Sequence, residues 1–169
     1  MTRLAGKIAL ITAEGQGAAP TMASKLIERT RWLEREVRKR MKESSATQLL
    51  GFSLEAIEKG RAVLRMDIRE RHKQIHGVVH GGVLAALADN TAAIAAYTMI
   101  ARGRELATVE MKINFLMPVA GTHAIAEARV LRAGRNFIVT ECEIRTRKGE
   151  LAAKALLTFG AAGGYSLRR

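Results

Sequence analysis

Apolar side chains recur at helical spacing between residues 24 and 43, amid many charged residues, which predicts an amphipathic helix. The narrow apolar stripe consists of Leu26, Leu33, Val37 and Met41. We expect the charged face, whose basic members are Arg31, Arg35, Arg38, Lys39, Arg40 and Lys42, to be solvated. The alternative for this face is contact with nucleic acid or a membrane surface.

Beyond Leu49 the pattern changes to short β-rich runs separated by tight turns. The runs cover residues 51–56, 61–68, 108–115, 122–131, 136–145 and 151–159. Three of the intervening segments are typical hairpin turns: Glu58-Lys59-Gly60, Ala133-Gly134-Arg135 and Lys148-Gly149-Glu150. Because such short turns connect antiparallel neighbours, the pattern predicts an antiparallel sheet.

A long helix is predicted between the second and third runs, from Gly82 to about Ala101. Apolar side chains lie around its whole circumference: Val83, Leu84, Leu87, Ile94, Tyr97, Met99 and Ile100. Such a helix must be surrounded, which favours a sheet curled around one central helix, with a second subunit supplying further burial. Asp89 near its middle would be costly in lipid, so we expect a buried helix and not a membrane span.

Composition narrows the class of protein. With 169 residues and 48% hydrophobic content, the chain suits one domain. The single cysteine, Cys142, excludes an intramolecular disulfide and is compatible with a reducing compartment, for which the cytoplasm is the default. A net charge of +12 indicates an anionic partner, but aromatic residues are only 4% of the chain, so the stacking platforms of single-strand binders are mostly missing.

The start of the central helix carries candidate chemistry in His80, Gly81 and Gly82. Glycine lets backbone approach a ligand closely, and the first N–H groups of a helix lack internal partners and carry the positive end of its dipole. These amides can therefore form an oxyanion hole. The alternative is a tight turn that needs glycine for its backbone angles.

Asp89 is a carboxylate in an alanine-rich helix, where an unpaired charge is costly to bury. It is a candidate general base or nucleophile, and the alternative is a structural, hydrogen-bonded aspartate. Gly81 and Asp89 stand eight residues apart, which separates them by roughly 12 Å along a helix. If both act on one carbonyl, the glycine must come from another copy, which predicts a two-fold dimer with two equivalent sites.

The histidines do not indicate a metal site, because no cysteine or acidic pair stands at ligand spacing near His76 and His80. A Gly-x-Ser-x-Gly nucleophile motif is also missing from the sequence. We expect His80 to hold the turn by hydrogen bonding, and His72 and His123 to be surface or loop residues. No metal or other cofactor is predicted.

Two segments carry a family resemblance: Gln74-Ile75-His76-Gly77-Val78-Val79-His80-Gly81-Gly82, continuing to Asp89, and Thr108-Val109-Glu110-Met111-Lys112-Ile113-Asn114-Phe115, continuing to Pro118. Over residues 49–159 the chain resembles the PaaI-type acyl-CoA thioesterases of the hotdog superfamily. The resemblance implies an α+β hotdog fold and metal-free hydrolysis of an acyl- or aryl-CoA thioester, in a homodimer that commonly pairs into a homotetramer.

The same resemblance assigns roles to residues. It implies that Asp89 attacks the thioester or activates water, while the Gly81 amide of the partner chain polarises the carbonyl. Gln74 stands where the family often has Asn, and is longer by a methylene, and Thr108 stands where it has Ser or Thr beside the carboxylate. The predicted substrate-binding set is His80, Gly82, Arg132, Gly134, Arg135 and Asn136, the last four forming a hairpin that resembles the segment near the CoA nucleotide. The alternative for that hairpin is an exposed turn with solubilising arginines.

A second resemblance lies at the N-terminus. Residues 3–12 followed by 13–19 resemble the first strand and glycine loop of short-chain dehydrogenases, but only Gly17 of the three usual glycines is in place, and Pro20 breaks the helix that should follow. Dinucleotide binding is therefore rejected. We divide the chain into an extension (1–21), an amphipathic helix (22–46), a hotdog thioesterase domain (47–160) and a tail (161–169).

Two other functions remain as alternatives. One is a non-catalytic acyl-CoA-binding regulator whose basic helix, residues 25–42, contacts DNA, although no helix-turn-helix is recognisable. The other is a hotdog dehydratase, whose histidine and glutamate pattern is not evident. An acyl carrier protein is a further possible partner for a basic thioesterase, whereas neither nucleic acid nor membrane is expected for the leading hypothesis.

Overall fold

The structure, a computed structural model, describes residues 21–162. Its elements are α1 (Met22–Glu43), α2 (Ser45–Leu50), β1 (Phe52–Glu58), β2 (Arg61–Asp67), the 3-10 helix η1 (Glu70–His72), α3 (Gly81–Tyr97), β3 (Glu105–Phe115), β4 (His123–Ala133), β5 (Phe137–Thr146) and β6 (Leu151–Ala162). The dehydrogenase-like segment and most of the predicted extension and tail lie outside the described residues.

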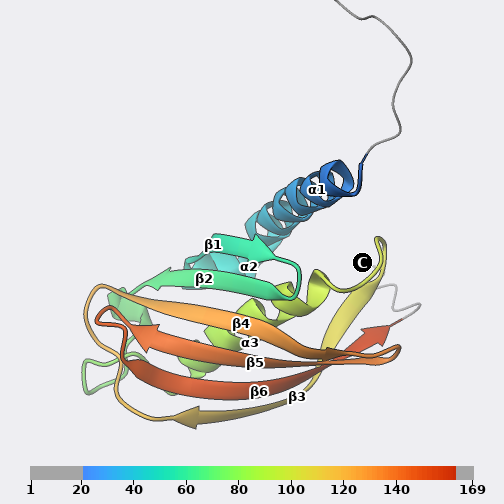
Figure 1. The fold of residues 1–169 in the computed structure, drawn as a ribbon. Helices are drawn as coiled ribbons and strands as arrows, with labels where there is room; N and C mark the ends of the chain where they lie inside the picture. Colours follow the sequence, from blue (N-terminus) through green and yellow to red (C-terminus); the bar gives the residue numbers. More distant parts are fainter. Residues whose placement is uncertain (1–20, 163–169) are drawn as a thin grey trace, which may run out of the picture.

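Six antiparallel strands form one sheet in the order β1-β2-β4-β5-β6-β3, which curves around α3 (Figure 1). All six predicted strands are present, and the three predicted turns connect β1 to β2, β4 to β5 and β5 to β6. The predicted α+β hotdog architecture, with an N-terminal helix before the sheet, is confirmed.

Small side chains let α3 approach the sheet closely. Alanines alternate along the inner face of β4, at Ala124, Ala126 and Ala128, and all three are fully buried. They face a helix whose buried side is itself rich in alanine, including Ala88 and Ala92. Larger side chains fill the space beside this contact: Leu64, Met66, Leu87, Ile138, Leu157 and Phe159. Close packing of this kind fixes the position of the helix.

One chain buries only one face of α3, and the expectation that a second subunit covers the remaining faces stays a prediction. The fully buried residues are Leu84, Leu87, Ala88, Thr91, Ala92, Ala95 and Ala96, whereas Val83, Ala86 and Ala93 remain partly exposed. The helix also ends at Tyr97, before the predicted Ala101, because the Thr98 hydroxyl donates to the Ala95 carbonyl at 2.7 Å and accepts from the Gly60 N–H at 2.7 Å.

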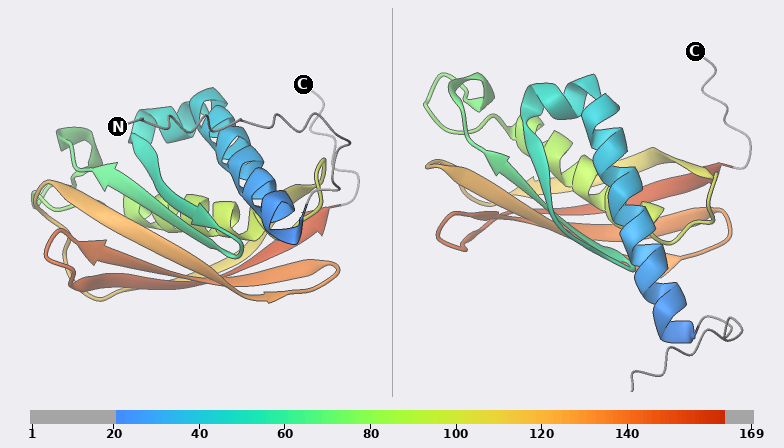
Figure 2. Two further views of the ribbon diagram at one scale, coloured as in Figure 1. Left: turned by 45° about the horizontal axis from the view of Figure 1, so that its top comes forward. Right: turned by 90° about the horizontal axis from the view of Figure 1, so that it is seen from above.

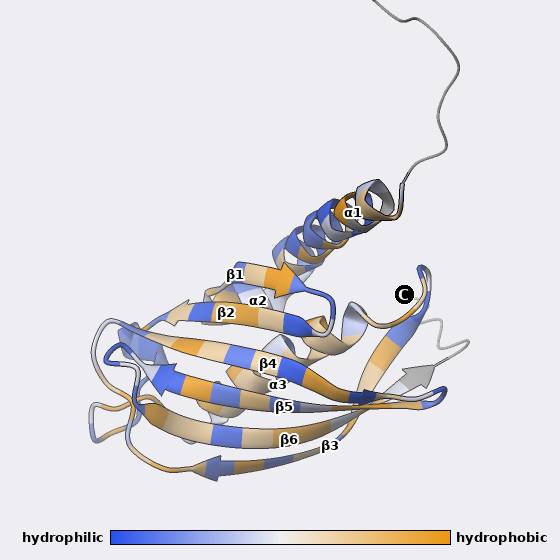
Figure 3. Ribbon diagram, in the orientation of Figure 1, coloured by the Kyte–Doolittle hydropathy of each residue, from blue (hydrophilic) through white to orange (hydrophobic). Residues whose placement is uncertain are grey.

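The N-terminal helix α1 packs beside the edge strand β1 and the helix α3 (Figure 2). Its residues are largely hydrophilic (Figure 3), and Leu33 and Val37 of the predicted stripe are buried. The charged face is not uniformly solvated, because Arg40 reaches Glu105 on β3 with two hydrogen bonds of 2.9 Å. Arg38 does lie in solvent, paired with Glu34 one turn earlier.

Among residues 21–162, no helix combines the length and the apolar character that a membrane crossing requires.

Leu87 offers a direct test of the contact between α3 and the sheet, because its side chain is fully buried. Leu87→Ala should lower the free energy of unfolding by about 2–5 kcal/mol, since it removes buried methyl groups and leaves a cavity. Chemical denaturation measures this loss. Ile75→Ala is the matched control, because Ile75 is 94% exposed, and its effect should stay within about 0.5 kcal/mol.

Candidate functional site

The loop before α3 is a tight hairpin that holds Gln74 beside the helix start. The Gln74 N–H donates to the Val78 carbonyl and the Gly77 N–H donates to the Gln74 carbonyl, both at 2.9 Å. Gly77 has a φ of 76°, which favours glycine. The Val79 N–H donates to the Val119 carbonyl at 2.8 Å, so the loop is anchored to the segment after β3.

His80 caps the start of α3. Its Nδ1 accepts a hydrogen bond from the Gly82 N–H at 2.9 Å, and its own N–H donates to the His72 carbonyl at 2.8 Å. The expectation that His80 holds this turn is confirmed. The Gly81 N–H has no acceptor among the residues that the structure describes, so it is an available donor at the positive end of the helix.

Gln74 and Gly81 line the same cavity, of about 390 Å³, together with Phe115 and Leu84. A Cβ added to Gly81 would lie 3.2 Å from Cζ of Phe115, so glycine permits close packing of that ring. Phe115 was not a predicted site residue. Nothing in its sequence context indicates that β3 returns to the start of α3.

Asp89 and Thr108 form the second part of the candidate site. The Thr108 hydroxyl donates to Oδ1 of Asp89 at 2.8 Å. The pairing of β3 with β6 is irregular directly after Thr108, where Val109 has no paired residue. Such bulges re-aim side chains and are frequent beside active sites. Asp89 is half-buried and Thr108 is exposed, so the carboxylate is polarised by a hydroxyl but open to a substrate.

Within one chain, the pair Gln74 and Gly81 lies apart from the pair Asp89 and Thr108. Gly81 is the first residue of α3 and Asp89 lies eight residues further along, or roughly 12 Å along the axis. The cavity lined by Gln74 and Gly81 is not lined by Asp89 or Thr108. One chain therefore presents two half-sites, which are called here the Gly81 half-site and the Asp89 half-site.

The predicted nucleotide-binding residues Arg132, Gly134, Arg135 and Asn136 are exposed at the turn between β4 and β5. The Gly134 N–H closes this turn on the Phe137 carbonyl at 2.8 Å. Arg132 also lines a cavity of about 450 Å³ together with Glu58, Lys59, Arg61 and Arg129. Arg61 is paired with Glu58 and Glu127, and Arg129 is paired with Glu127. A CoA-binding role for this hairpin stays a prediction.

His72 contradicts the expectation of a surface or loop position, because it is fully buried. Its Nδ1 accepts from the Arg69 N–H at 3.2 Å, and its Nε2 has no hydrogen-bond partner among the described residues. Burial, with added repulsion from Arg71 and Arg69, lowers the pKa of His72. A neutral imidazole thus lies directly behind the turn that His80 caps.

Cys142 takes no part in this chemistry. It lies fully buried on β5, and burial raises the pKa of its thiol to about 12. A thiolate nucleophile is therefore not available at neutral pH.

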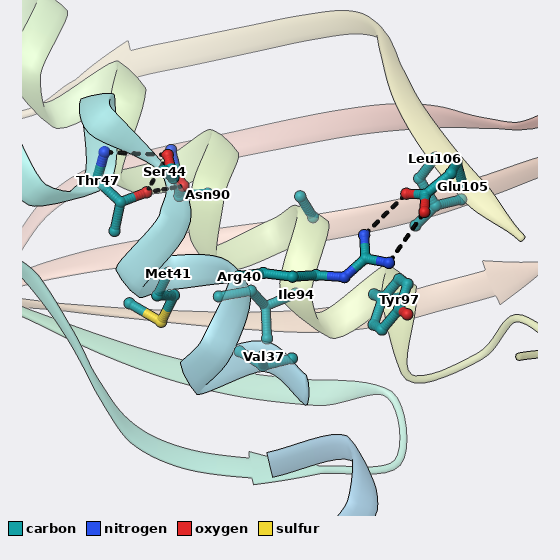
Figure 4. Close-up of a pocket in the computed structure, with 11 residues that line it drawn as sticks. Val37, Arg40, Met41, Ser44, Thr47, Asn90, Ile94, Tyr97, Glu105 and Leu106 are labelled. Carbon is teal, nitrogen blue, oxygen red and sulfur yellow. Dashed lines mark hydrogen bonds and ion pairs between the residues drawn. The ribbon is translucent and has the colours of Figure 1, made fainter. Parts of the chain in front are cut away.

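A further cavity, of about 210 Å³, lies between α1, α3 and β3 and is called here the α1 chamber (Figure 4). Its apolar lining comes from Val37, Met41, Ala93, Ile94 and Leu106. At one end Arg40 binds Glu105 and lies over the Tyr97 ring, 4.8 Å from the centroid. The hydrogen bonds with Glu105 raise the pKa of Arg40 and lower that of Glu105, while burial raises the pKa of Tyr97.

Comparison with known proteins gives a consistent result. Residues 76–153 match the family described as the thioesterase superfamily. A putative esterase of Saccharolobus solfataricus is 39% identical over 100 residues, covering 59% of this chain and 71% of that protein. Human acyl-coenzyme A thioesterase 13 is 30% identical over 124 residues, covering 71% and 88%. The E. coli PaaI protein of the phenylacetic acid degradation operon shares the fold, with a TM-score of 0.73, 24% identity, and coverage of 80% of this chain and 96% of that protein.

Acid should destabilise the fold through His72. Its pKa is lower in the folded state, so the unfolded chain takes up a proton first, from about pH 6.5 downward. The stability that depends on neutral His72 is complete above about pH 6.5 and decreases as the pH falls towards the lowered pKa. Urea denaturation at several pH values measures this loss.

His72→Asn should flatten that decrease, since the Asn Oδ1 can still accept from the Arg69 N–H without titrating. His76→Asn is the control, because His76 is exposed, and it should leave the pH dependence unchanged. An equally steep loss of stability in His72→Asn would show that other groups cause it.

Proposed function

The chain belongs to the thioesterase superfamily and is a thioester hydrolase, and we propose that it hydrolyses an acyl- or aryl-CoA thioester to the free acid and CoA. The observation that carries this proposal is the half-buried Asp89 carboxylate held by the Thr108 hydroxyl at 2.8 Å. CoA as the carrier is supported by the names of two relatives, acyl-coenzyme A thioesterase 13 and 1,4-dihydroxy-2-naphthoyl-CoA hydrolase.

Asp89 acts as general base or nucleophile in this proposal. Its Oδ1 accepts from Thr108, and Oδ2 has no hydrogen-bond partner among the described residues, so Oδ2 is open to water or the thioester carbon. As a base, it takes a proton from water while the water oxygen bonds to the carbonyl carbon. As a nucleophile, it forms an acyl anhydride that water then cleaves. In both cases the carbon–sulfur bond breaks and the CoA sulfur receives a proton.

The Gly81 N–H stabilises the oxyanion that develops on the carbonyl oxygen. A backbone donor at a helix start is already oriented and needs no reorganisation during the reaction. Gln74 lines the same cavity. In this proposal it orients the thioester or the water, with a side chain one methylene longer than that of Asn. His80 contributes by holding the turn through the Gly82 N–H.

A homodimer is proposed because the two half-sites of one chain are roughly 12 Å apart along α3. Strand β3 is an edge of the sheet, and long unpaired edges are templates for pairing with another chain. Val109, Phe115 and Leu116 are at least 50% exposed along or just after this strand. A two-fold partner covering this region would bring each Asp89 to the other chain's Gly81. Assembly into a homotetramer stays a prediction.

The positive charge of the chain favours an anionic carrier group, as CoA or an acyl carrier protein provides. The basic hairpin with Arg132 and Arg135 is the proposed contact for CoA phosphates, because guanidinium groups pair well with phosphate. The regulator alternative gains no support from α1, since Leu33, Val37 and Arg40 engage the rest of the domain. A cytoplasmic location remains part of this proposal.

Asp89→Asn should lower kcat for acyl-CoA hydrolysis by about 10²–10⁴-fold, because an amide can neither accept the proton nor attack the carbonyl. Thr108→Val should cost about ten-fold through loss of one charge-assisted hydrogen bond, and Thr108→Ser, which keeps the hydroxyl, should retain most activity. Release of free thiol from a panel of acyl-CoAs measures these rates. Full activity in Asp89→Asn would remove Asp89 from the mechanism.

Gly81→Pro removes the proposed oxyanion donor with little other change. Gly81 is the first helical residue, where proline is tolerated, and His80 before it is extended with ψ of 135°, as a residue preceding proline prefers. We expect a loss of about 10²–10³-fold in kcat.

Gly81→Ala is the matched control for that variant. It adds the same Cβ near the flexible end of Phe115 but keeps the N–H, so it should retain far more activity than Gly81→Pro. Equal activity of the two variants would mean that the Gly81 amide is not the oxyanion donor.

A further inference from the structure

The α1 chamber begins beside the Asp89 half-site. Asn90, which lines it, follows Asp89 directly, and Ala93 lies one helical turn further on. Leu106 of the chamber and Thr108 alternate with Ala107 along β3, so their side chains lie on the same face of that strand. The chamber is therefore placed to receive the part of a substrate that extends from a carbonyl held at Asp89.

At the end of the chamber away from Asp89 lies the Arg40–Glu105 ion pair. Arg40 spans from α1 to β3 and binds both carboxylate oxygens of Glu105 at 2.9 Å, with Tyr97 beneath the guanidinium (Figure 4). Because these side chains are still 41% and 43% exposed, the charge pairing itself contributes little stability. The end wall is formed by the bulk of the Arg40 guanidinium, which its two hydrogen bonds and the Tyr97 ring hold in one orientation. The side walls, by contrast, carry apolar groups such as Val37 and Ile94 that favour a hydrocarbon.

Two independent estimates give the size of the group that fits. A cavity of 150 Å³ holds the six carbons of benzene, so 210 Å³ corresponds to about eight carbons in proportion. Tyr97 is eight residues beyond Asp89, roughly 12 Å along the helix, and Glu105 is three residues from Thr108, roughly 10 Å along the strand. At ~1.3 Å advance per carbon–carbon bond, a length of about 10 Å also accommodates about eight carbons.

We propose that the α1 chamber holds the acyl group and that the Arg40–Glu105 pair, supported by Tyr97, is the end wall that sets the longest acyl chain accepted. This inference rests on the proposed function, because it places the thioester carbonyl at Asp89. It makes the N-terminal helix a specificity element of the site. Arg40 and Glu105 act on chain length and not on the chemical step.

Binding of S-alkyl-CoA thioethers tests the end wall without requiring hydrolysis. Calorimetry with the wild-type protein should show affinity rising about four-fold per methylene until the alkyl group reaches about eight carbons, and then no further gain. In the double variant Arg40→Ala/Glu105→Ala the rise should continue to about twelve carbons, since both charges and their bulk are removed together. Arg38→Ala/Glu34→Ala removes an exposed ion pair of the same helix and should keep the wild-type profile.

A chain-length profile that is the same in the wild-type protein and in Arg40→Ala/Glu105→Ala would overturn the proposal. Acyl-CoA hydrolysis measured in parallel separates the two claims: an altered length profile without any hydrolysis would reject the proposed function but support the end wall. Hydrolysis with an unaltered length profile would support the proposed function and reject the end wall.

A second variant should shorten the accepted acyl chain instead of lengthening it. It leaves the Arg40–Glu105 ion pair intact, so the test does not require the protein to fold without that pair. Ala93→Leu adds three carbons inside the chamber one turn beyond Asp89, so the longest chain accepted should shorten from about eight to about five carbons. Thermal unfolding confirms that each variant is folded. An unchanged length preference in folded Ala93→Leu would place the acyl group elsewhere.

Discussion

The rigid helix α3 is the element on which the candidate site depends. Its alanine-rich face lies against the buried alanines of β4, and this close packing fixes its position on the sheet. Gly81 at its first turn and Asp89 in its middle are therefore held roughly 12 Å apart along the axis. No adjustment within one chain brings an oxyanion donor and a carboxylate at that separation onto the same carbonyl. The chemistry thus favours an arrangement in which two chains each supply half of a site.

The two ends of α3 make different contacts and contribute to different parts of the candidate site. At the N-terminus, His80 accepts from the Gly82 N–H, so the capping interaction leaves the Gly81 N–H as the amide for the proposed oxyanion hole. Towards the C-terminus, Tyr97 meets the Arg40–Glu105 pair that joins α1 to β3. Between them, Thr108 orients Asp89 from a bulged edge strand. Along α3 therefore lie, in order, the proposed oxyanion donor Gly81, the proposed base Asp89, and Tyr97 at the end of the α1 chamber.

The sequence predicts the elements well because local signals determine them. Glycine-containing turns mark the hairpins, and apolar spacing marks α1 and α3. The end of α3 was predicted too late, because Met99 and Ile100 continue the apolar pattern, while the bond between Thr98 and the distant Gly60 that terminates it has no local signal. Strand β3 begins at Glu105 and not at the predicted Thr108, since its pairing with β6 decides its length.

The residues of the candidate site also divide into those that the local sequence indicates and those that only distant contacts bring into place. Asp89 is recognisable as a carboxylate in an apolar helix, and its contact with Thr108 agrees with the family resemblance. Burial of His72 and the ion pair between Arg40 and Glu105 were not predicted, because polar residues are assigned to the surface unless tertiary partners are known. Phe115 likewise reaches Gly81 only through the return of β3.

Mixing two inactive variants tests the shared site most directly. Chains with Gly81→Pro and chains with Asp89→Asn, carrying different affinity tags, would be refolded together and the mixed oligomers isolated. Random pairing makes about half of the dimers mixed, and each mixed dimer contains one intact site, so the refolded sample should recover about a quarter of the wild-type activity. Activity no greater than that of the two variants alone, in isolated mixed oligomers, would contradict a site built from two chains.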